Sequence, residues 1–257
     1  MHAITVRPTD TTDSKGRHRP GPECIEWTEV PTPQPGPGEA LVKVTAAGIN
    51  RGDLLQRQGL YPPPKGVSDT MGLEVTGTVS ALGPGVDWSE GDEVVALLAG
   101  GGYAEYVIVP AGQLLPIPDG IDPVTASTLI EVAATVISNM DHVGLAKGET
   151  FLVHGGAGGI GQFAIQYAKS LGCTVITTCG TAEKQEFCRA LGADVVLNYH
   201  DDWVGGVKDA TEGRGADVIL DVMGAKYLGL NVDALATGGR LDIIGMQGGV
   251  RGELNIG

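Results

Sequence analysis

Residues 151–172 read FLVHGGAGGIGQFAIQYAKSLG, and this stretch decides the fold. The apolar run Phe151–Val153 is typical of a buried strand, and it leads directly into glycines. Gly156, Gly158 and Gly161 fit the pattern G-x-G-x-x-G, which suits a strand-to-helix turn that offers free helix N–H groups to a dinucleotide pyrophosphate. Apolar residues then recur at helical spacing: Ile160, Phe163, Ala164, Tyr167, Ala168 and Leu171. The pattern predicts a dinucleotide-binding turn; the alternative is a merely tight turn without a ligand.

Each glycine of this turn has an expected role. We expect Gly156 to make the tight turn, Gly158 to let the backbone approach a phosphate, and Gly161 to let the helix pack closely on the sheet. Gly159 and Ile160 complete the predicted binding loop. His154 ends the strand beside the glycines, and we interpret it as a packed strand-end residue rather than a proton carrier.

The composition indicates a globular protein with a sizeable core. The 257 residues exceed the usual size of one domain, and 42% of them are hydrophobic. No apolar run approaches the roughly 20 residues that span a bilayer, and the start lacks the apolar segment of a signal peptide, so we expect a cytoplasmic protein. The net charge of −14 argues against nucleic acid and against an anionic membrane surface as partners.

The cysteines and the first histidines give no sign of a metal centre. The four cysteines show no C-x-x-C spacing, and we expect them to be reduced structural thiols rather than ligands of a metal cluster. They are Cys24, Cys173, Cys179 and Cys188. His2 and His18, near the start of the chain, are interpreted as solvated residues.

The first half of the chain is rich in Gly and Pro and contains short β-type runs, which predict a compact, partly open β-barrel. The expected strands are Leu41–Thr45, Val75–Ser80, Glu93–Ala96, Ala104–Val109 and Leu114–Ile117. Residues 31–39, PTPQPGPGE, are expected to form an extended loop. Asp122 and Pro123 predict a helix start, and this helix is expected to run to about Met140.

From Thr150 onward strands alternate with helices, which requires crossover connections and predicts a parallel sheet covered on both faces. Further strands are expected at Thr174–Thr178, Asp194–Leu197, Val218–Val222 and Leu241–Gly245, with helices from Thr181 to Gly192 and near Tyr227–Leu235. We therefore expect an α/β protein in which residues 1–122 form the barrel and residues 123–257 form a Rossmann domain.

The end of the second strand of this domain indicates which dinucleotide is preferred. It reads Thr178-Cys179-Gly180-Thr181, without the carboxylate that usually binds the ribose 2′-OH of NAD. Lys184 follows in the first helical turn, where a cation is unfavourable by about 0.3–1 kcal/mol unless it faces an anion. We therefore expect NADPH, with NADH less favoured; alternatively, Lys184 pairs with Glu183 or Glu186.

The chain resembles the zinc-free quinone oxidoreductase branch of the medium-chain dehydrogenase/reductase superfamily, and within it the p53-inducible type. The resemblance rests on Ala46–Pro64 (AAGINRGDLLQRQGLYPPP), Gly72–Val86, Gly100–Pro110, Ile117–Ile121, the glycine loop, Leu191–Tyr199 and Ala216–Gly224. It implies a GroES-like substrate domain followed by the Rossmann domain. It also implies NADPH-dependent reduction of quinones or activated enones by direct hydride transfer.

The resemblance further implies that no zinc is bound. Zinc alcohol dehydrogenases carry Cys where this chain has Asn50 and His where it has Leu73, just before Glu74. They also carry four closely spaced cysteines for structural zinc, and this chain has no such cluster. Since catalytic zinc needs three protein ligands of N, S or O type, Leu73 cannot be one of them.

The site residues are carried over by position. The resemblance implies that Asn50 and Tyr61 line the nicotinamide and substrate cleft, where an amide N–H and a phenol O–H can bind the acceptor oxygen. Alternatively, Asn50 caps a helix that starts near Gly52, and Tyr61 is a loop anchor. The implied cofactor contacts are Thr135, Gly180, Thr181, Lys184, Tyr199, Val222, Gly245 and Met246, in addition to the glycine loop. The family's proline near Thr135 is replaced by Ile130, which weakens that one assignment.

Members of the family continue beyond the match to Gly257, so the chain is interpreted as a truncated form whose full-length version is a homodimer. The unpaired sheet edge would be a liability for solubility. Two other functions compete with quinone reduction: reduction of an acyl-thioester double bond, and a truncated inactive or regulatory partner. An RNA-binding role is disfavoured by the negative charge.

Overall fold

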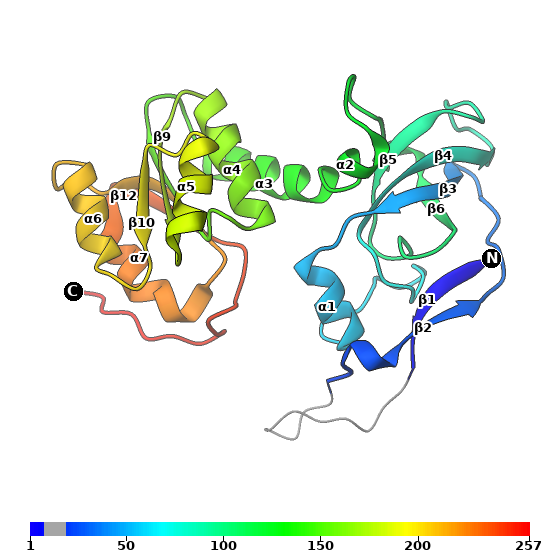
Figure 1. Cartoon of the computed structure of the whole chain (residues 1–257), viewed down its shortest axis with the longest axis horizontal. Helices are drawn as coiled ribbons and strands as arrows, with labels where there is room; N and C mark the ends of the chain where they lie inside the picture. Colours follow the sequence, from blue (N-terminus) through cyan, green and yellow to red (C-terminus); the bar gives the residue numbers. More distant parts are fainter. Residues whose placement is uncertain (8–18) are drawn as a thin grey trace. The chain divides into compact units, whose positions relative to one another are not determined.

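The computed structural model describes residues 1–7 and 19–257, which form two compact units, Met1–Glu131 and Val132–Gly257 (Figure 1). His18 lies outside the described residues. His2 begins a strand and its ring stacks on Trp27 with ring centroids 5.6 Å apart; its side chain is 45% exposed, which agrees with its interpretation as a solvated residue. No helix in the part of the chain that the structure describes is both long and apolar enough to cross a membrane.

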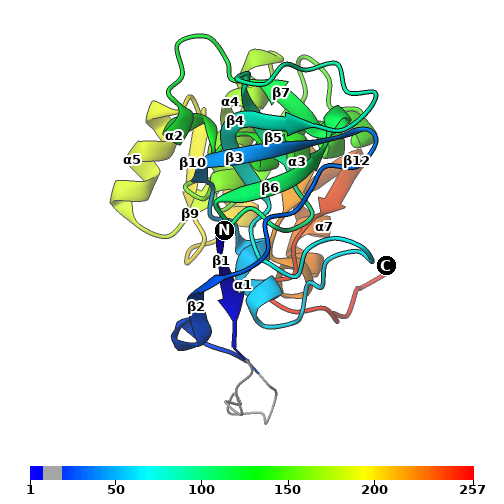
Figure 2. The ribbon, with the colours of Figure 1, turned by 90° about the vertical axis from the view of Figure 1, so that its right-hand side faces the viewer.

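The first unit contains an antiparallel sheet of five strands in the order β6-β3-β4-β5-β7. These strands are β3 (Glu39–Ala47), β4 (Glu74–Leu82), β5 (Glu93–Leu97), β6 (Tyr106–Pro110) and β7 (Leu114–Pro116). Figure 2 shows β6 and β7 at opposite edges, so the barrel is partly open, as expected. Alternate residues such as Val75, Val79 and Val107 fill its core.

A two-stranded ribbon in the same unit was not predicted. It pairs β1 (His2–Val6) with β2 (Ile25–Glu29), and a short 3-10 helix, η1 (Pro22–Cys24), precedes β2. A second 3-10 helix, η2 (Ala111–Gln113), joins β6 to β7. Strands β1 and β2 pair over a long sequence separation; β1 (HAITV) lacks strict alternation, and in β2 (IEWTE) the alternation of apolar and polar residues is short.

The helix expected from Asp122 to about Met140 is interrupted, so that prediction was wrong in its middle. The structure has α2 (Pro123–Ala126) and α3 (Ile130–Val143) instead. The expected start is correct, since Asp122 Oδ1 accepts the N–H groups of Val124 and Thr125, both at 3.0 Å. The interruption follows from a distant residue: Glu74 Oε2 accepts the Glu131 N–H at 3.0 Å, so a carboxylate from β4 caps the first turn of α3.

The second unit is a doubly wound parallel sheet with strand order β10-β9-β8-β11-β12. Its strands are β8 (Thr150–His154), β9 (Thr174–Cys179), β10 (Val195–Asn198), β11 (Ala216–Asp221) and β12 (Leu235–Ile243). Its helices are α4 (Gly159–Ser170), α5 (Ala182–Ala190), α6 (Trp203–Ala210) and α7 (Leu228–Ala234), with the 3-10 helix η3 (Gly224–Tyr227) before α7. The expected Rossmann fold is therefore present, although α6 was not predicted.

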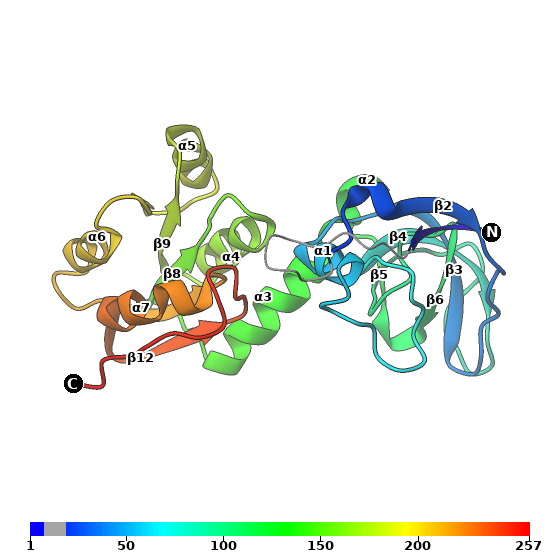
Figure 3. The same cartoon turned by 90° about the horizontal axis from the view of Figure 1, so that it is seen from below.

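Two hydrophobic clusters cover the two faces of this sheet. Phe151 and Val153 of β8 pack with α3 and α4, while Leu152, between them, packs with α6 and α7. Successive residues of β8 thus contact opposite helical layers, as expected for a strand that is buried on both faces of the sheet. Figure 3 shows α6 and α7 side by side, in agreement with their mutual contacts. The cysteines of this unit are free and buried, as is Cys24 in the first unit.

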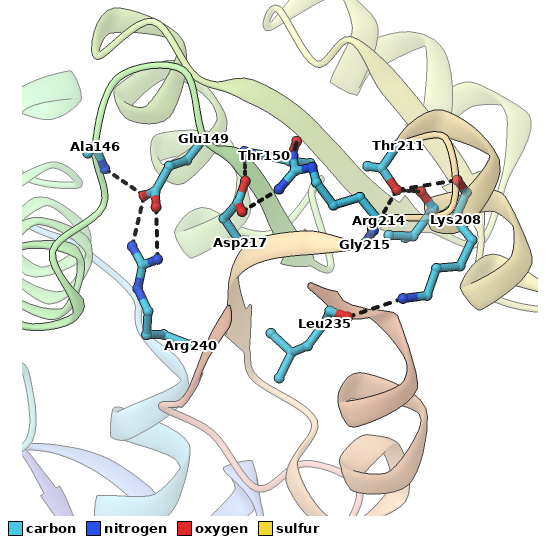
Figure 4. Close-up of polar contacts among 11 residues, drawn as sticks. Ala146, Glu149, Thr150, Lys208, Thr211, Arg214, Gly215, Asp217, Leu235 and Arg240 are labelled. Carbon is cyan, nitrogen blue, oxygen red and sulfur yellow. Dashed lines mark hydrogen bonds and ion pairs between the residues drawn. The ribbon is translucent and has the colours of Figure 1, made fainter. Parts of the chain in front are cut away.

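An ion-pair network ties together the amino-terminal ends of the strands (Figure 4). Arg240 on β12 donates to both carboxylate oxygens of Glu149 at 2.8 Å, and it also donates to the carbonyls of Val143 and Gly144 at the end of α3. Arg214 pairs with Asp217 on β11. The hydrogen bonds from Arg240 hold the pKa of the Glu149 carboxyl below its usual range. This network fixes the strand ends that face away from the glycine turn.

Candidate functional site

The glycine turn after β8 is closed by contacts that leave no room for side chains. Gly155, which was not among the three glycines of the pattern, has φ of 72° and takes the left-handed position of the turn. A Cβ on Gly156 would collide with Thr177 Oγ1 and would lie 2.9 Å from Cys188 Sγ. A Cβ on Gly161 would collide with Gly155 O, which is the close helix approach that was expected. The turn therefore requires glycine at these positions for different physical reasons.

The turn presents the amino end of α4 to the carboxyl edge of the sheet. Gly158 is the N-cap of this 12-residue helix, and a Cβ there would meet only Gly155 O, at 3.3 Å. The first N–H groups of a helix, here those of Gly159, Ile160 and Gly161, have no intrahelical acceptor. These N–H groups and the positive end of the helix dipole form a cradle that suits a pyrophosphate.

Beside this turn, the end of β9 carries the residues expected to bind the adenosine side. A Cβ on Gly180 would collide with the Tyr199 hydroxyl, so the tyrosine ring lies directly against this glycine. Thr181 caps α5, since its Oγ1 accepts the Lys184 N–H at 3.3 Å. The Lys184 side chain is exposed and makes no ion pair within residues 1–7 and 19–257; Glu186 pairs with Arg189 instead, at 3.3 Å.

The ends of β11 and β12 bring the remaining expected residues to the same edge. Val222 follows β11, and its Cγ2 lies 3.9 Å from a Cβ built on Gly155. A Cβ on Gly245 would lie 2.6 Å from Val222 O, so the two chain segments cross closely. The Met246 side chain is 62% exposed. Thr135 lies on α3, with its carbonyl accepting the Asn139 amide at 2.7 Å.

His154 is a packed residue, which agrees with its interpretation from sequence. It is buried, and both ring nitrogens have partners: Nδ1 lies 3.0 Å from Thr178 Oγ1, and Nε2 lies 2.8 Å from Asn231 Oδ1. Burial lowers the pKa of the imidazole. Neither nitrogen is open to a ligand.

In the first unit, Asn50 is fixed by Glu74. Asn50 is the N-cap of α1 (Arg51–Arg57) and forms a capping box with Asp53, as the alternative interpretation expected, and its Nδ2 also donates to Glu74 Oε1 at 2.8 Å. Glu74 is 1% exposed, and burial raises the pKa of its carboxyl. One N–H of the Asn50 amide is thus committed to Glu74, and the amide is held in one orientation.

Two further polar residues belong to this cluster and were missed from sequence. Asp53 is buried, and its Oδ2 accepts the Asn50 N–H and the Tyr103 hydroxyl, each at 2.6 Å. Burial raises the pKa of Asp53, and burial together with the Asp53 carboxylate raises that of Tyr103. Only the N-R-G-D spacing of a capping box signals Asp53, and nothing local signals Tyr103, which is 50 residues away.

Apolar surface surrounds α1. A cavity of about 340 Å³ is lined by Asp53 and Tyr103 together with Ile25, Ala47, Ile49, Leu54, Arg57 and Met71. Ile49, next to Asn50, is 83% exposed, and the Tyr61 side chain is 51% exposed. This volume is at the lower end of the range for small-molecule sites.

Asn50 and Leu73 stand at the two positions where zinc alcohol dehydrogenases carry the ligands Cys and His. Leu73 is a buried apolar residue, and Asn50 is bound to Glu74. Across the described residues, no group of three or more His, Cys, Asp or Glu side chains is arranged to hold a metal ion.

Comparisons with known proteins agree with this architecture. A family model described as "Alcohol dehydrogenase GroES-like domain" matches residues 36–119, and one described as "Zinc-binding dehydrogenase" matches residues 159–257. The match whose description mentions zinc begins at residue 159, so it includes neither Asn50 nor Leu73.

Three relatives illustrate the similarity. Prostaglandin reductase-3 of Bos taurus is 38% identical over 86% of this chain and 59% of its own length. A quinone oxidoreductase of Pseudomonas aeruginosa is 34% identical over 92% of this chain and 74% of its own. A mycobacterial protein complexed with NADPH has a TM-score of 0.85 and 36% identity, covering 99% of this chain and 77% of that one. The chain thus spans about three fifths of the bovine relative.

Proposed function

Since this chain belongs to the quinone oxidoreductase branch of the medium-chain dehydrogenase/reductase superfamily, we propose that it reduces quinones or activated enones with NADPH and without zinc. The observation that carries the proposal is the glycine cradle at the amino end of α4, beside a strand end that lacks a carboxylate. The NADPH complex of the mycobacterial relative supports the same cofactor.

The second unit is proposed to hold the cofactor. Gly156, Gly158, Gly159, Ile160 and Gly161 form the proposed pyrophosphate cradle. Its backbone N–H groups supply local donors for an anion that a chain of net charge −14 does not attract overall. The cofactor, when bound, supplies the hydride. Val222, Gly245, Met246 and Thr135 are proposed to contact its nicotinamide side.

Preference for NADPH is assigned to Lys184. Its exposed ammonium lies in the first turn of α5, where it makes no ion pair among the described residues and would be favoured by an anion such as a 2′-phosphate. Gly180, Thr181 and Tyr199 complete this part of the site, since the Tyr199 ring lies against Gly180. A carboxylate that would repel the phosphate does not follow β9.

In the first unit, Asn50 and Tyr61 are proposed to bind the acceptor oxygen. Glu74 takes one N–H of the Asn50 amide, which leaves the other available as a fixed donor. The Tyr61 hydroxyl is a second donor on an exposed side chain. Negative charge that develops on the acceptor oxygen would be stabilised by such oriented donors without a metal ion. The exposed Ile49 beside Asn50 supports an apolar organic acceptor.

The cofactor preference is tested by equilibrium binding of NADPH and NADH to the wild type and to Lys184→Glu. We expect the variant to bind NADPH about 10- to 100-fold more weakly, because a hydrogen bond to a charged group contributes about 1.5–3 kcal/mol. NADH binding should change little. Lys147→Glu is the matched control, since it makes the same charge change on the exposed side chain of a residue before β8. Equal losses in both variants would refute a specific role of Lys184.

The acceptor is tested by a turnover screen with quinones, enones and enoyl-thioesters. Faster turnover of quinones or enones supports the proposal, and faster turnover of enoyl-thioesters would assign the competing reductase activity. Binding of NADPH without turnover of any acceptor would favour an inactive or regulatory form. Co-elution with a full-length homologue would test that role and the expected homodimer.

A further inference from the structure

A chain of four buried polar side chains crosses the carboxyl edge of the sheet in the second unit. His154 and Thr178 lie in β8 and β9, Asp221 ends β11, and Asn231 lies on α7; each is at most 1% exposed. His154 contacts Thr178 at 3.0 Å and Asn231 at 2.8 Å, and Asn231 Nδ2 donates to Asp221 Oδ2 at 3.0 Å. We call this set the His154 relay. Buried polar groups of this kind are costly unless every partner is present.

The hydrogen bonds fix the direction of each donor. Asn231 donates through Nδ2 to the Asp221 carboxylate, so its Oδ1 faces His154 and can only accept. His154 Nε2 therefore carries the proton, and Nδ1 accepts from the Thr178 hydroxyl. The rings of Trp203 and Tyr227 contact the imidazole edge-to-face, with centroids 4.8 and 4.9 Å away, and they shield it from water. The ring is held neutral in one tautomer.

One end of the His154 relay holds the glycine turn. The Thr178 carbonyl accepts the N–H groups of Gly155 and Gly156, both at 3.1 Å. The Thr178 hydroxyl also accepts the Gly155 N–H, at 3.4 Å. Since Oγ1 is oriented by its bond to His154, the position of the turn depends on the imidazole.

The other end holds the turn after β11. Asp221 accepts the N–H groups of Met223 at 2.6 Å and Gly224 at 2.9 Å through its carboxylate. Its carbonyl accepts those of Ile244 and Gly245 at 2.9 and 3.3 Å. These two segments flank Val222 and Gly245, which are on the nicotinamide side of the proposed site. The His154 relay thus connects the backbone of the glycine turn with the backbone of the Val222–Gly245 crossing.

We propose that His154 is a positioning residue that sets the spacing of the glycine turn and the Val222–Gly245 crossing, so that the dinucleotide site is preformed before the cofactor binds. The inference rests on the proposed cofactor-binding function. In a preformed site, cofactor binding does not have to include the free-energy cost of ordering two loops. Loss of the His154 relay should therefore appear mainly as weaker cofactor binding.

The test compares His154→Phe with Ile219→Val. Phe keeps a ring between Trp203 and Tyr227 but removes both hydrogen bonds, and Ile219 is a buried core residue of β11 that makes no contribution to the His154 relay. In the cofactor-free protein, we expect His154→Phe to speed amide hydrogen exchange at Gly155–Gly156 and at Met223–Gly224 together. We also expect about 10- to 100-fold weaker NADPH binding, as for an unsatisfied buried group. Ile219→Val should lower the melting temperature without either effect.

Two results obtained without cofactor would overturn the proposal. One is that the rates of amide hydrogen exchange at both turns are the same in His154→Phe and Ile219→Val after correction for the difference in their melting temperatures. The other is an ¹⁵N spectrum in which His154 carries its proton on Nδ1. Since both are measured without cofactor, they are independent of the proposed function, which fails separately if the wild type binds no NADPH. If exchange rises at both turns while NADPH binding is unchanged, the positioning role for the cofactor is refuted.

Discussion

Replacing Gly161 by Ala tests whether the glycine turn is built by close approach of backbone. A Cβ at this position would collide with Gly155 O and would lie 2.5 Å from Gly156 Cα. Both are backbone atoms, so the turn must shift and no flexible side chain can move away instead. Overpacking of this kind costs about 1–3 kcal/mol. Replacing Gly by Ala inside a helix stabilises the fold by about 0.5–1 kcal/mol, so the free energy of unfolding should fall by a net amount of about 1 kcal/mol.

The effect on binding should exceed the effect on stability. The atoms displaced by Gly161→Ala form the cradle itself, so we expect NADPH to bind at least about tenfold more weakly, which corresponds to about 1.4 kcal/mol. Gly229→Ala in α7 is the matched control, because a Cβ there meets nothing within 4 Å. The control should be slightly more stable than the wild type and bind NADPH equally well. Urea denaturation and fluorescence titration measure the two quantities. The reasoning is refuted if both variants behave alike.

Three further predictions concern the strand ends and the acceptor residues. Arg240→Met should lower the free energy of unfolding by about 1–3 kcal/mol at pH 7, because it leaves Glu149 unpaired. Since Arg240 depresses the folded-state pKa of Glu149, this contribution is complete above the unfolded pKa of about 4.3 and is lost as the pH falls below it. Urea denaturation at pH 7 and pH 3 should therefore show the difference between wild type and variant shrinking; an unchanged difference would contradict the assignment. Tyr61→Phe should lower kcat for quinones with unchanged NADPH binding, whereas unchanged turnover would remove Tyr61 from the chemistry. Glu74→Gln should also lower kcat, by about tenfold or more, because a Gln side chain cannot accept from both Asn50 and Glu131; stopped-flow single turnovers would show whether the loss lies in the chemical step.

Much of the Rossmann unit could be predicted because its signals are local. The glycine turn, the cap at Thr181 and the stop at Gly192 each depend on a few neighbouring residues, and the structure places them at the ends of α4 and α5. The resemblance to the family added the order of the two domains. The type of quinone oxidoreductase within the branch stays a prediction.

What could not be predicted depends on residues that meet only in the folded chain. The break before α3 is set by Glu74, which lies 57 positions from Glu131. Asn231 reaches His154 over 77 positions, so the sequence around His154 gives no sign of its role. The positive φ of Gly155 shows the same limit, because a run of glycines does not reveal which one adopts the left-handed conformation.

The central claim is that the glycine cradle of this chain binds NADPH in preference to NADH. The most direct test is a fluorescence titration of the wild-type chain with each dinucleotide under identical conditions. We predict saturable binding of both, with NADPH at least about tenfold tighter because only it carries the 2′-phosphate. Absence of saturable NADPH binding, or NADH binding as tightly as NADPH, would contradict the account.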